Sequence, residues 1–362
     1  NANAIFGFLN ITSTGNLTME VGANITVQND FYCYNSTTLT NHTVVLGNLM
    51  LYAGCNLTVS NGKSLTVNGN VTISSDTWLV AGTGAMSFGS LNITSGGVYN
   101  ATTVTTAVTN NVSISGTFYH NNGTLDTEDT IVVLAGSFIT SPITNAKAVS
   151  IASGASYNLS AGTNLTLNDV SGANINNAGD LNIFGTDSNK VKIACGASNN
   201  CPINSLSGTQ FIESTNVTNM DMMTCGSTNI IRNSTIITSG GWGVYQAGGR
   251  TLIMNNTKVT STVSSLAVYI QGGSFVCDSC TIISGNWPLG FHQPTDLTAY
   301  VFNSNISATA TTIAVAPTVD PTSTNNHIYF RNTSILGTVS STKAWANGVW
   351  LYSENHNYIQ NE

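Results

Sequence analysis

The chain has 362 residues and a formal net charge of −7 at pH 7, and only 7% of its residues are charged, against about 25% in an ordinary soluble domain. Hydrophobic residues still make up 41% of the chain, so the composition excludes a disordered chain that has no core. The nine Lys and Arg residues are scattered, which argues against a nucleic-acid partner. The chain contains no run of about 20 apolar residues, so no membrane span is predicted.

Residues 1–30 begin with an apolar segment that is free of charge and proline between Ile5 and Ile11. Such a segment favours an extended strand, and we predict that it pairs with a neighbouring subunit. The alternative is that it pairs with the first coil of its own chain. The predicted assembly residues are Ile5, Phe6, Phe8, Leu9 and Ile11.

Residues 31–204 form a β-rich domain of short apolar-polar-apolar units, such as those starting at Leu57, Leu65 and Val71. A period of two indicates a strand with one buried face. Three strands fit between Leu57 and Leu79, which are 22 residues apart, and this spacing predicts the early coils of a parallel β-helix. Asn-Gly pairs, as at Asn61, are typical hairpin turns, so a β-sandwich for the first half stays an alternative.

Residues 205–362 repeat with a period of about 23 residues. In each repeat an apolar residue follows shortly after a pair of small polar residues such as Asn and Ser, and these apolar residues form a first column of equivalent positions, or track. An aromatic or aliphatic residue at another position of each repeat forms a second track. The first track comprises Ile236, Val259, Ile282, Ile306 and Ile335, which are 23, 23, 24 and 29 residues apart, and the second comprises Tyr245, Tyr269, Phe291 and Val315, which are 24, 22 and 24 apart. Two tracks with one period indicate a solenoid, so we predict that Ile236, Val259 and Ile282 stack.

Between about residues 205 and 355 the chain resembles the pectate-lyase-like right-handed β-helix superfamily. The resemblance is carried by the repeated unit, one turn or lap of the solenoid, with Asn-Ser before an apolar residue. The resemblance implies an all-β fold but not one activity, because that fold serves lyases, hydrolases, adhesins and structural proteins. The overall composition is similar to that of archaeal surface-layer and extracellular filament proteins.

A polysaccharide lyase or hydrolase of this superfamily is expected to cluster carboxylates, with a basic residue in the lyases. The late laps offer only isolated acids and bases, so no catalytic residue is predicted and an enzyme is not favoured. These isolated residues are Asp221, Asp278 and Asp296, and Arg232, Arg250 and Arg331.

The densest acidic cluster comprises Asp126, Glu128 and Asp129, with His120 upstream. Three carboxylates are a weak candidate site for Ca²⁺, and a solvated acidic loop is the favoured interpretation, so no cofactor is predicted. Tyr245, Tyr269, Phe291 and His292 form either a carbohydrate-stacking strip or, as favoured here, part of the core.

Seven cysteines leave one thiol unpaired or available for an intermolecular disulfide. Cys33 and Cys55 are one lap apart, which predicts a disulfide between stacked coils, and Cys195 and Cys201 can close a small loop. The single CxxC at Cys277 and Cys280 indicates a local disulfide or a pair of buried thiols, because zinc needs a second such pair.

Eighteen Asn-X-Ser/Thr sequons predict N-linked glycans on a secreted protein. They begin at Asn10, Asn16, Asn24, Asn35, Asn41, Asn56, Asn70, Asn92, Asn100, Asn111, Asn122, Asn158, Asn164, Asn216, Asn233, Asn255, Asn305 and Asn332. The sequence starts at Asn1 without a leader, as expected of a mature or trimmed secreted chain.

The ends of a solenoid expose strand edges and an apolar cross-section unless they are capped. Here the apolar runs at Ile5 and at Val349 replace polar caps. We therefore predict an extracellular or cell-surface structural subunit that binds copies of itself head to tail in a filament or coat. The alternatives are a carbohydrate-binding adhesin module and a polysaccharide-degrading enzyme.

Overall fold

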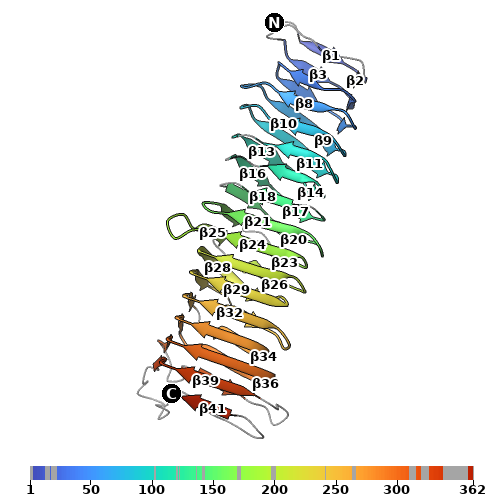
Figure 1. Cartoon of the computed structure of the whole chain (residues 1–362). Helices are drawn as coiled ribbons and strands as arrows, with labels where there is room; N and C mark the ends of the chain where they lie inside the picture. The colour runs from blue at the N-terminus through green and yellow to red at the C-terminus, as the bar shows by residue number, and fades with distance from the viewer. Residues whose placement is uncertain are drawn as a thin grey trace. The chain divides into compact units, whose positions relative to one another are not determined.

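The computed structural model is all-β. It describes residues 3–12, 17, 23–101, 103–119, 121, 123–135, 137–140, 143–168, 173–196, 201–240, 242–262, 266–309, 315–318, 326–336 and 358–361. The chain forms two compact units, residues 1–168 (unit 1) and 169–362 (unit 2). Each unit is a parallel β-solenoid in which strands of successive coils lie side by side (Figure 1). The predicted domain boundaries after residues 30 and 204 stay predictions.

Unit 1 has three sheets, and two of them share the long strands β9 and β11. Sheet 1A contains β1 (Ala4–Phe6), β3 (Ile25–Val27), β6 (Thr43–Val45), β9 (Leu65–Ile73), β11 (Met86–Ile93), β13 (Thr105–Val108), β16 (Thr124–Thr127), β19 (Ile143–Ala146) and β22 (Asn164–Leu167). Sheet 1B contains β2 (Leu9–Ile11), β4 (Phe31–Cys33), β7 (Leu49–Leu51), β9, β11, β14 (Val112–Ile114), β17 (Thr130–Val133) and β20 (Ala148–Ile151). Sheet 1C contains β5 (Thr37–Leu39), β8 (Asn56–Val59), β10 (Trp78–Val80), β12 (Val98–Asn100), β15 (Thr117–Tyr119), β18 (Ser137–Thr140) and β21 (Ser156–Ser160).

Unit 2 repeats this plan with longer strands. Sheet 2A contains β24 (Asp180–Phe184), β27 (Thr209–Glu213), β29 (Thr228–Arg232), β32 (Thr251–Asn255), β34 (Leu266–Asp278), β36 (Trp287–Phe302), β39 (His327–Arg331) and β41 (Tyr358–Asn361). Sheet 2B contains β25 (Val191–Cys195), β28 (Thr215–Thr224), β30 (Thr235–Thr238), β33 (Lys258–Ser261), β35 (Thr281–Ser284), β37 (Asn305–Ala308) and β40 (Ser334–Leu336). Sheet 2C contains β23 (Asn174–Asn177), β26 (Cys201–Ser205), β28, β31 (Val244–Gln246), β34, β36 and β38 (Val315–Thr318).

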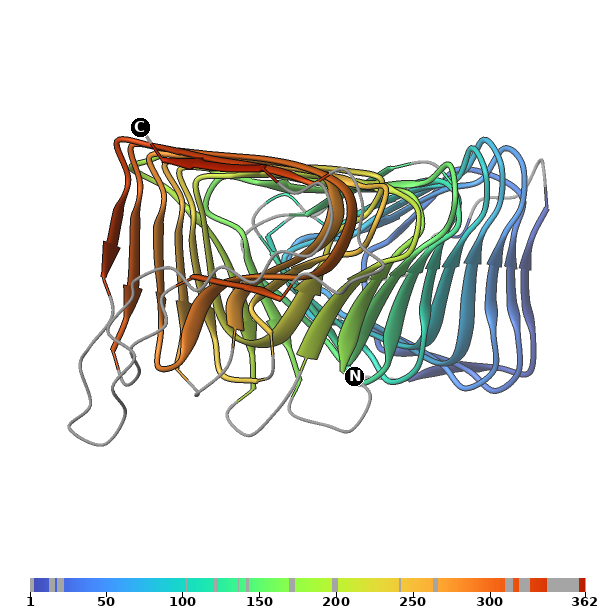
Figure 2. The ribbon, with the colours of Figure 1, turned by 90° about the horizontal axis from the view of Figure 1, so that it is seen from below.

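The strand pairings confirm the predicted solenoid in both units. In unit 1 the described strands pair in parallel with strands of the preceding and following coils, as Ile25 does with Ala4 and Thr43. The β-sandwich alternative for the first half is therefore wrong. In unit 2, Ile236 pairs with Val259 and Val259 with Ile282. This ladder continues through Ile306 to Ile335, and Figure 2 shows the aligned strands of successive coils.

The second predicted track needs a correction. Tyr245 pairs with Tyr269 as expected, but Tyr269 pairs with Gly290, and Phe291 pairs with Ile270. A shift of one position exchanges the two faces of a strand, so Phe291 lies in the core, where it is fully buried.

The core of each unit consists of apolar columns along the coils, since alternate strand residues point inward. In unit 1 three aromatic rings fill part of this core. The ring centroids of Tyr99 and Phe118 are 5.0 Å apart and those of Phe88 and Tyr99 are 6.0 Å apart, in edge-to-face contact. The buried Tyr99 hydroxyl lies 2.8 Å from the Thr106 hydroxyl, which satisfies its hydrogen-bonding requirement. Within the described ranges, no helix has the length and apolar character to cross a membrane.

Candidate functional site: an assembly edge and laddered surfaces

The predicted assembly segment forms the first strands of unit 1. Strand β1 pairs with β3 and β2 pairs with β4, both within the chain, as the alternative interpretation expected. Leu9 and Ile11 point into the core, with 8% and 4% of their surface exposed, whereas Ile5 and Phe8 are 64% and 65% exposed. Phe6 is half-buried. Among the described residues, β1 has β3 and β2 has β4 as its hydrogen-bonded neighbour.

One corner of unit 2 carries a ladder of polar residues in the left-handed backbone conformation. Asn233, Asn256 and Asn303 have φ values of 50°, 45° and 47°, a region that asparagine tolerates better than most residues. The Asn256 amide donates to Asn233 Oδ1 at 2.9 Å, and the Asn332 amide donates to Asn303 Oδ1 at 2.9 Å. The recurring Asn-Ser pairs of the sequence are thus coil-to-coil bridges at a turn.

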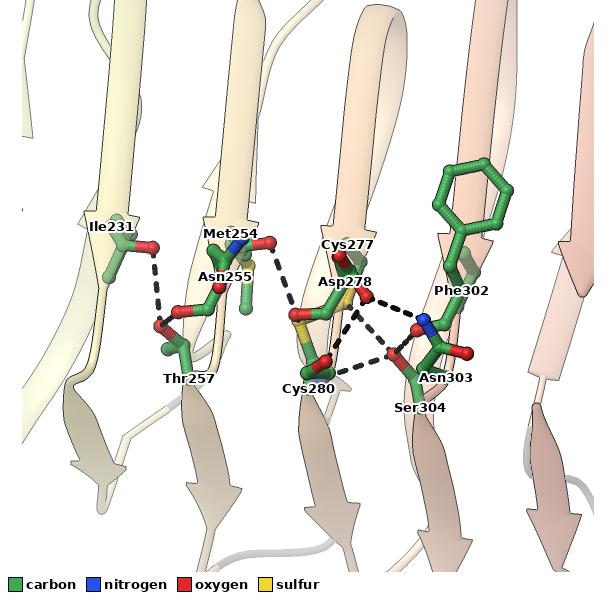
Figure 3. Close-up of a disulfide and its surroundings, with 12 residues drawn as sticks. Ile231, Met254, Asn255, Thr257, Cys277, Asp278, Cys280, Phe302, Asn303 and Ser304 are labelled. Atoms are coloured by element: carbon green, nitrogen blue, oxygen red, sulfur yellow. Dashed lines mark hydrogen bonds between the residues drawn. A yellow bond between two sulfur atoms is a disulfide. The ribbon is translucent and has the colours of Figure 1, made fainter. Parts of the chain in front are cut away.

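A second ladder runs directly behind the first. Thr257 and Ser304 are buried, and each donates its hydroxyl to the carbonyl two residues earlier, at 2.9 and 2.5 Å. Cys280 occupies the equivalent place in the coil between them, and its N–H donates to Ser304 Oγ at 3.1 Å. Cys280 is bonded to Cys277 at the end of β34 (Figure 3), so the CxxC is a local disulfide built into this ladder.

A surface hollow of about 610 Å³ lies beside these ladders. Its lining comprises Ser279, Cys280, Thr281, Asn303, Ser304, Asn305, Asn332, Thr333 and Ser334. Among the described residues, hydroxyl and amide groups therefore dominate its lining, which includes neither a carboxylate nor an imidazole.

Unit 1 has its own polar corner, which includes a carboxylate. Asp30 Oδ1 accepts hydrogen bonds from the Asn48 backbone N–H at 2.7 Å and from its side-chain amide at 3.0 Å, and Tyr32 donates to Asp30 Oδ2 at 3.0 Å. Asn48 Oδ1 in turn accepts from the Asn70 N–H at 2.9 Å. These donors, led by the Asn48 backbone N–H and opposed by partial desolvation, lower the pKa of Asp30 below its ordinary value.

We expect the stability of unit 1 to depend on pH through Asp30. Folding favours the ionised carboxylate, so its stabilisation is full above the ordinary aspartate pKa of about 3.9 and is lost as the pH falls through the lower folded value. The Asp30→Asn variant keeps an acceptor oxygen but does not titrate. Urea midpoints of both proteins, measured from neutral to strongly acidic pH, should converge in acid; parallel pH profiles would contradict the assignment.

The cysteines pair as predicted. Cys33 bonds to Cys55 with a Cα separation of 5.6 Å, so it joins β4 to the turn before β8, and Cys195 bonds to Cys201 across a Cα separation of 5.8 Å. Cys225 is the unpaired thiol in the structure and is fully buried. Its burial, partly offset by the Arg250 charge, raises its pKa to about 12, so the thiol stays protonated and unreactive.

The described sequons lie mostly at the surface. Exposed side chains belong to Asn10, Asn24, Asn56, Asn70, Asn92, Asn111, Asn255, Asn305 and Asn332, and half-buried ones to Asn35, Asn100, Asn158, Asn164, Asn216 and Asn233. Asn41 is only 1% exposed, so its side chain is inaccessible to a glycan in the folded chain, because this sequon falls at an inward-facing position. Asn16 and Asn122 lie outside the described residues.

The acidic cluster does not form a metal centre in the described part of the chain, where no three His, Cys, Asp or Glu side chains converge. Asp126 and Glu128 are exposed, and Asp129 accepts a hydrogen bond from the Thr130 hydroxyl at 3.2 Å. His120 lies outside the described residues. The isolated Arg250 has a structural role, because it donates to the carbonyl oxygens of Ser205, Leu206 and Cys225.

The predicted aromatic strip is divided between surface and core. Tyr245 and Tyr269 stack with their centroids 5.3 Å apart, and Trp242, which the sequence analysis did not single out, lies 5.4 and 4.7 Å from them. Trp242 is 39% exposed. The only sequence feature that could have pointed to Trp242 is its position between two glycines, three residues before Tyr245. Phe291 belongs to the core. The side chain of His292 is not among those that the structure describes.

Comparisons with known protein families, with curated proteins and with solved structures find no significant match to this chain.

Proposed function

We propose that the protein is a structural subunit of an extracellular filament or surface coat, glycosylated and assembled end to end. The observation that carries the proposal is the first coil, where Ile5 on β1 and Phe8 in the connection between β1 and β2 are exposed, and where each of these two strands has one described hydrogen-bonded neighbour. A second copy of the chain that pairs along the other edge would bury Ile5 and Phe8. Such a contact joins two different surfaces, so it continues as a filament unless rotation closes it.

Three further features support this role. The disulfides are the covalent pattern expected in an oxidising compartment. The sequons of the outward-facing positions can carry glycans, and the proposal omits Asn41 because it is buried. The stacked polar corners tie several neighbouring coils together in both units, which suits a protein that bears load rather than one that changes shape.

Electron microscopy and light scattering of the purified protein test the assembly. We expect the double substitution Ile5→Asp and Phe8→Asp to abolish end-to-end association, because it would place charge at the proposed contact. Leu46→Asp is the matched control, since Leu46 is 47% exposed in unit 1 but lies away from this edge. Filaments that persist in the double variant, or a wild-type chain that stays monomeric at high concentration, would refute the proposal.

The aromatic group of Trp242, Tyr245 and Tyr269 favours the second candidate function, a carbohydrate-binding adhesin module. An exposed aromatic ring with a polar edge suits a sugar ring, and Trp242 is such a ring, 39% exposed, beside the half-buried Tyr245 and the buried Tyr269. Gln271 fixes the two tyrosines by accepting from Tyr245 at 2.5 Å and donating to Tyr269 at 3.1 Å. This candidate and the membership of the pectate-lyase-like superfamily both remain proposals.

A further inference from the structure

The outer face of sheet 2A carries three parallel columns of side chains on the consecutive strands β27, β29, β32, β34, β36 and β39. The apolar column in the middle contains Phe211, Ile230, Ile253, Val276, Tyr300 and Tyr329. On one side the charged column contains Glu213, Arg232, Asn255, Asp278, Phe302 and Arg331. On the other side the hydroxyl column contains Thr209, Thr228, Thr251, Ser274 and Thr298, followed by His327.

The apolar column is a partly exposed stripe on a sheet face. Tyr300 is 36% exposed, and its ring stacks on Tyr329 at 5.0 Å and on Phe302 at 5.8 Å. The other members of the column are half-buried. At the opposite end, the Arg232 guanidinium lies 5.8 Å above the Phe211 ring. An apolar stripe between polar margins is typical of a surface that binds another protein.

The order of residues in the charged column identifies the partner. From Glu213 to Arg331 the column reads negative, positive, amide, negative, aromatic, positive. We propose that this face binds the same face of a second copy of the chain in antiparallel orientation, about a two-fold axis that runs along the strands between β32 and β34.

This rotation brings each column opposite itself in reverse order. Glu213 then faces Arg331 of the second copy, Arg232 faces Phe302, and Asn255 faces Asp278, each of them twice. The three contacts are an ion pair, a cation–π contact and an amide–carboxylate hydrogen bond. In the apolar column, Ile253 faces Val276 and Ile230 faces Tyr300. A parallel arrangement, about a two-fold axis along the solenoid, would instead place the charged column against the hydroxyl column, so that Glu213 faces Thr209 and Arg331 faces His327 and no ion pair forms.

The antiparallel contact is incompatible with a glycan at one sequon, Asn255. Asn255 stands beside the two-fold axis, so a glycan there would hold the two faces apart. Asn255 is therefore unmodified in the associated protein, although its side chain is exposed in the single chain. Six strands extend only about 24 Å along the solenoid, so one contact is small and weak, and it forms at high protein concentration or where many subunits are arrayed.

Charge reversal tests the contact. We expect Glu213→Arg and Arg331→Glu each to weaken self-association more than about tenfold, because each places two like-charged pairs across the axis. An equimolar mixture of the two variants restores both ion pairs, so its association should return to the wild-type level. Lys258→Glu is the control for charge, since the exposed Lys258 lies on sheet 2B. Sedimentation over a concentration series measures association, and circular dichroism confirms folding.

Three results would overturn the proposal: single variants that associate like the wild type, a mixture that does not recover, or a glycan on Asn255 in the associated protein. Its failure is distinguishable from failure of the end-to-end proposal. Face variants should leave end-to-end association intact, and the Ile5→Asp, Phe8→Asp variant should leave the lateral contact intact.

Discussion

Replacing Phe118 with alanine is expected to lower the free energy of unfolding of unit 1 by about 3–5 kcal/mol, as is typical when a buried phenylalanine is truncated. The Phe118 side chain is fully buried and pairs with Tyr99 of the preceding coil, where the two rings meet edge to face. Its loss leaves a cavity that the rigid coils cannot easily close, because their backbones are fixed by hydrogen bonds on both sides.

Tyr119 supplies the matched control for Phe118. It is the next residue on β15, but it points outward and is 38% exposed. Tyr119→Ala removes a ring of similar size from the same strand and should cost well under half as much. Urea unfolding monitored by circular dichroism compares the two variants. Equal losses would mean that the core column is not the main source of stability at this coil.

Removing the Cys33–Cys55 disulfide is expected to cost about 3 kcal/mol, because the bond closes a loop of 22 residues in the unfolded chain. Both cysteines are fully buried, so the double substitution to alanine avoids a buried unpaired thiol. The bond links β4 to the turn before β8, and its loss should also allow the first coils to unfold before the rest of unit 1.

The Cys277–Cys280 pair is the control for loop length, since its cysteines are only three positions apart in the sequence. The same chain-entropy argument gives about 1.5 kcal/mol for its removal. Thermal unfolding and limited proteolysis of the two double-alanine variants measure the difference. If both variants lose the same stability, the loop-closure explanation is wrong for this protein.

Local sequence determined the solenoid itself. Inward-facing Ile236, Val259 and Ile282 recur at a nearly constant spacing, and a coil that buries one of them brings the next into register. The Cys33–Cys55 bond was predicted from a spacing of one lap and is present, although the register partner of Cys33 in the next coil is Leu51, so Cys55 lies four residues beyond one full lap. Asn233 and Asn256 marked the corners, since few other residues tolerate the left-handed conformation that a turn there requires.

Only the tertiary structure decided which residues share a surface. Lap length varies between coils, so Phe291 falls one position from the outer track and enters the core, and Asn41 turns inward despite its sequon. The Trp242 ring contacts the rings of Tyr245 and Tyr269 because the turn that carries it brings it there, and no periodic pattern in the sequence predicts the conformation of that turn. The antiparallel self-complementarity of Glu213 and Arg331 spans 118 residues of sequence, and it emerges only when the register of six strands is fixed, because each register error of one residue moves a side chain to the opposite face.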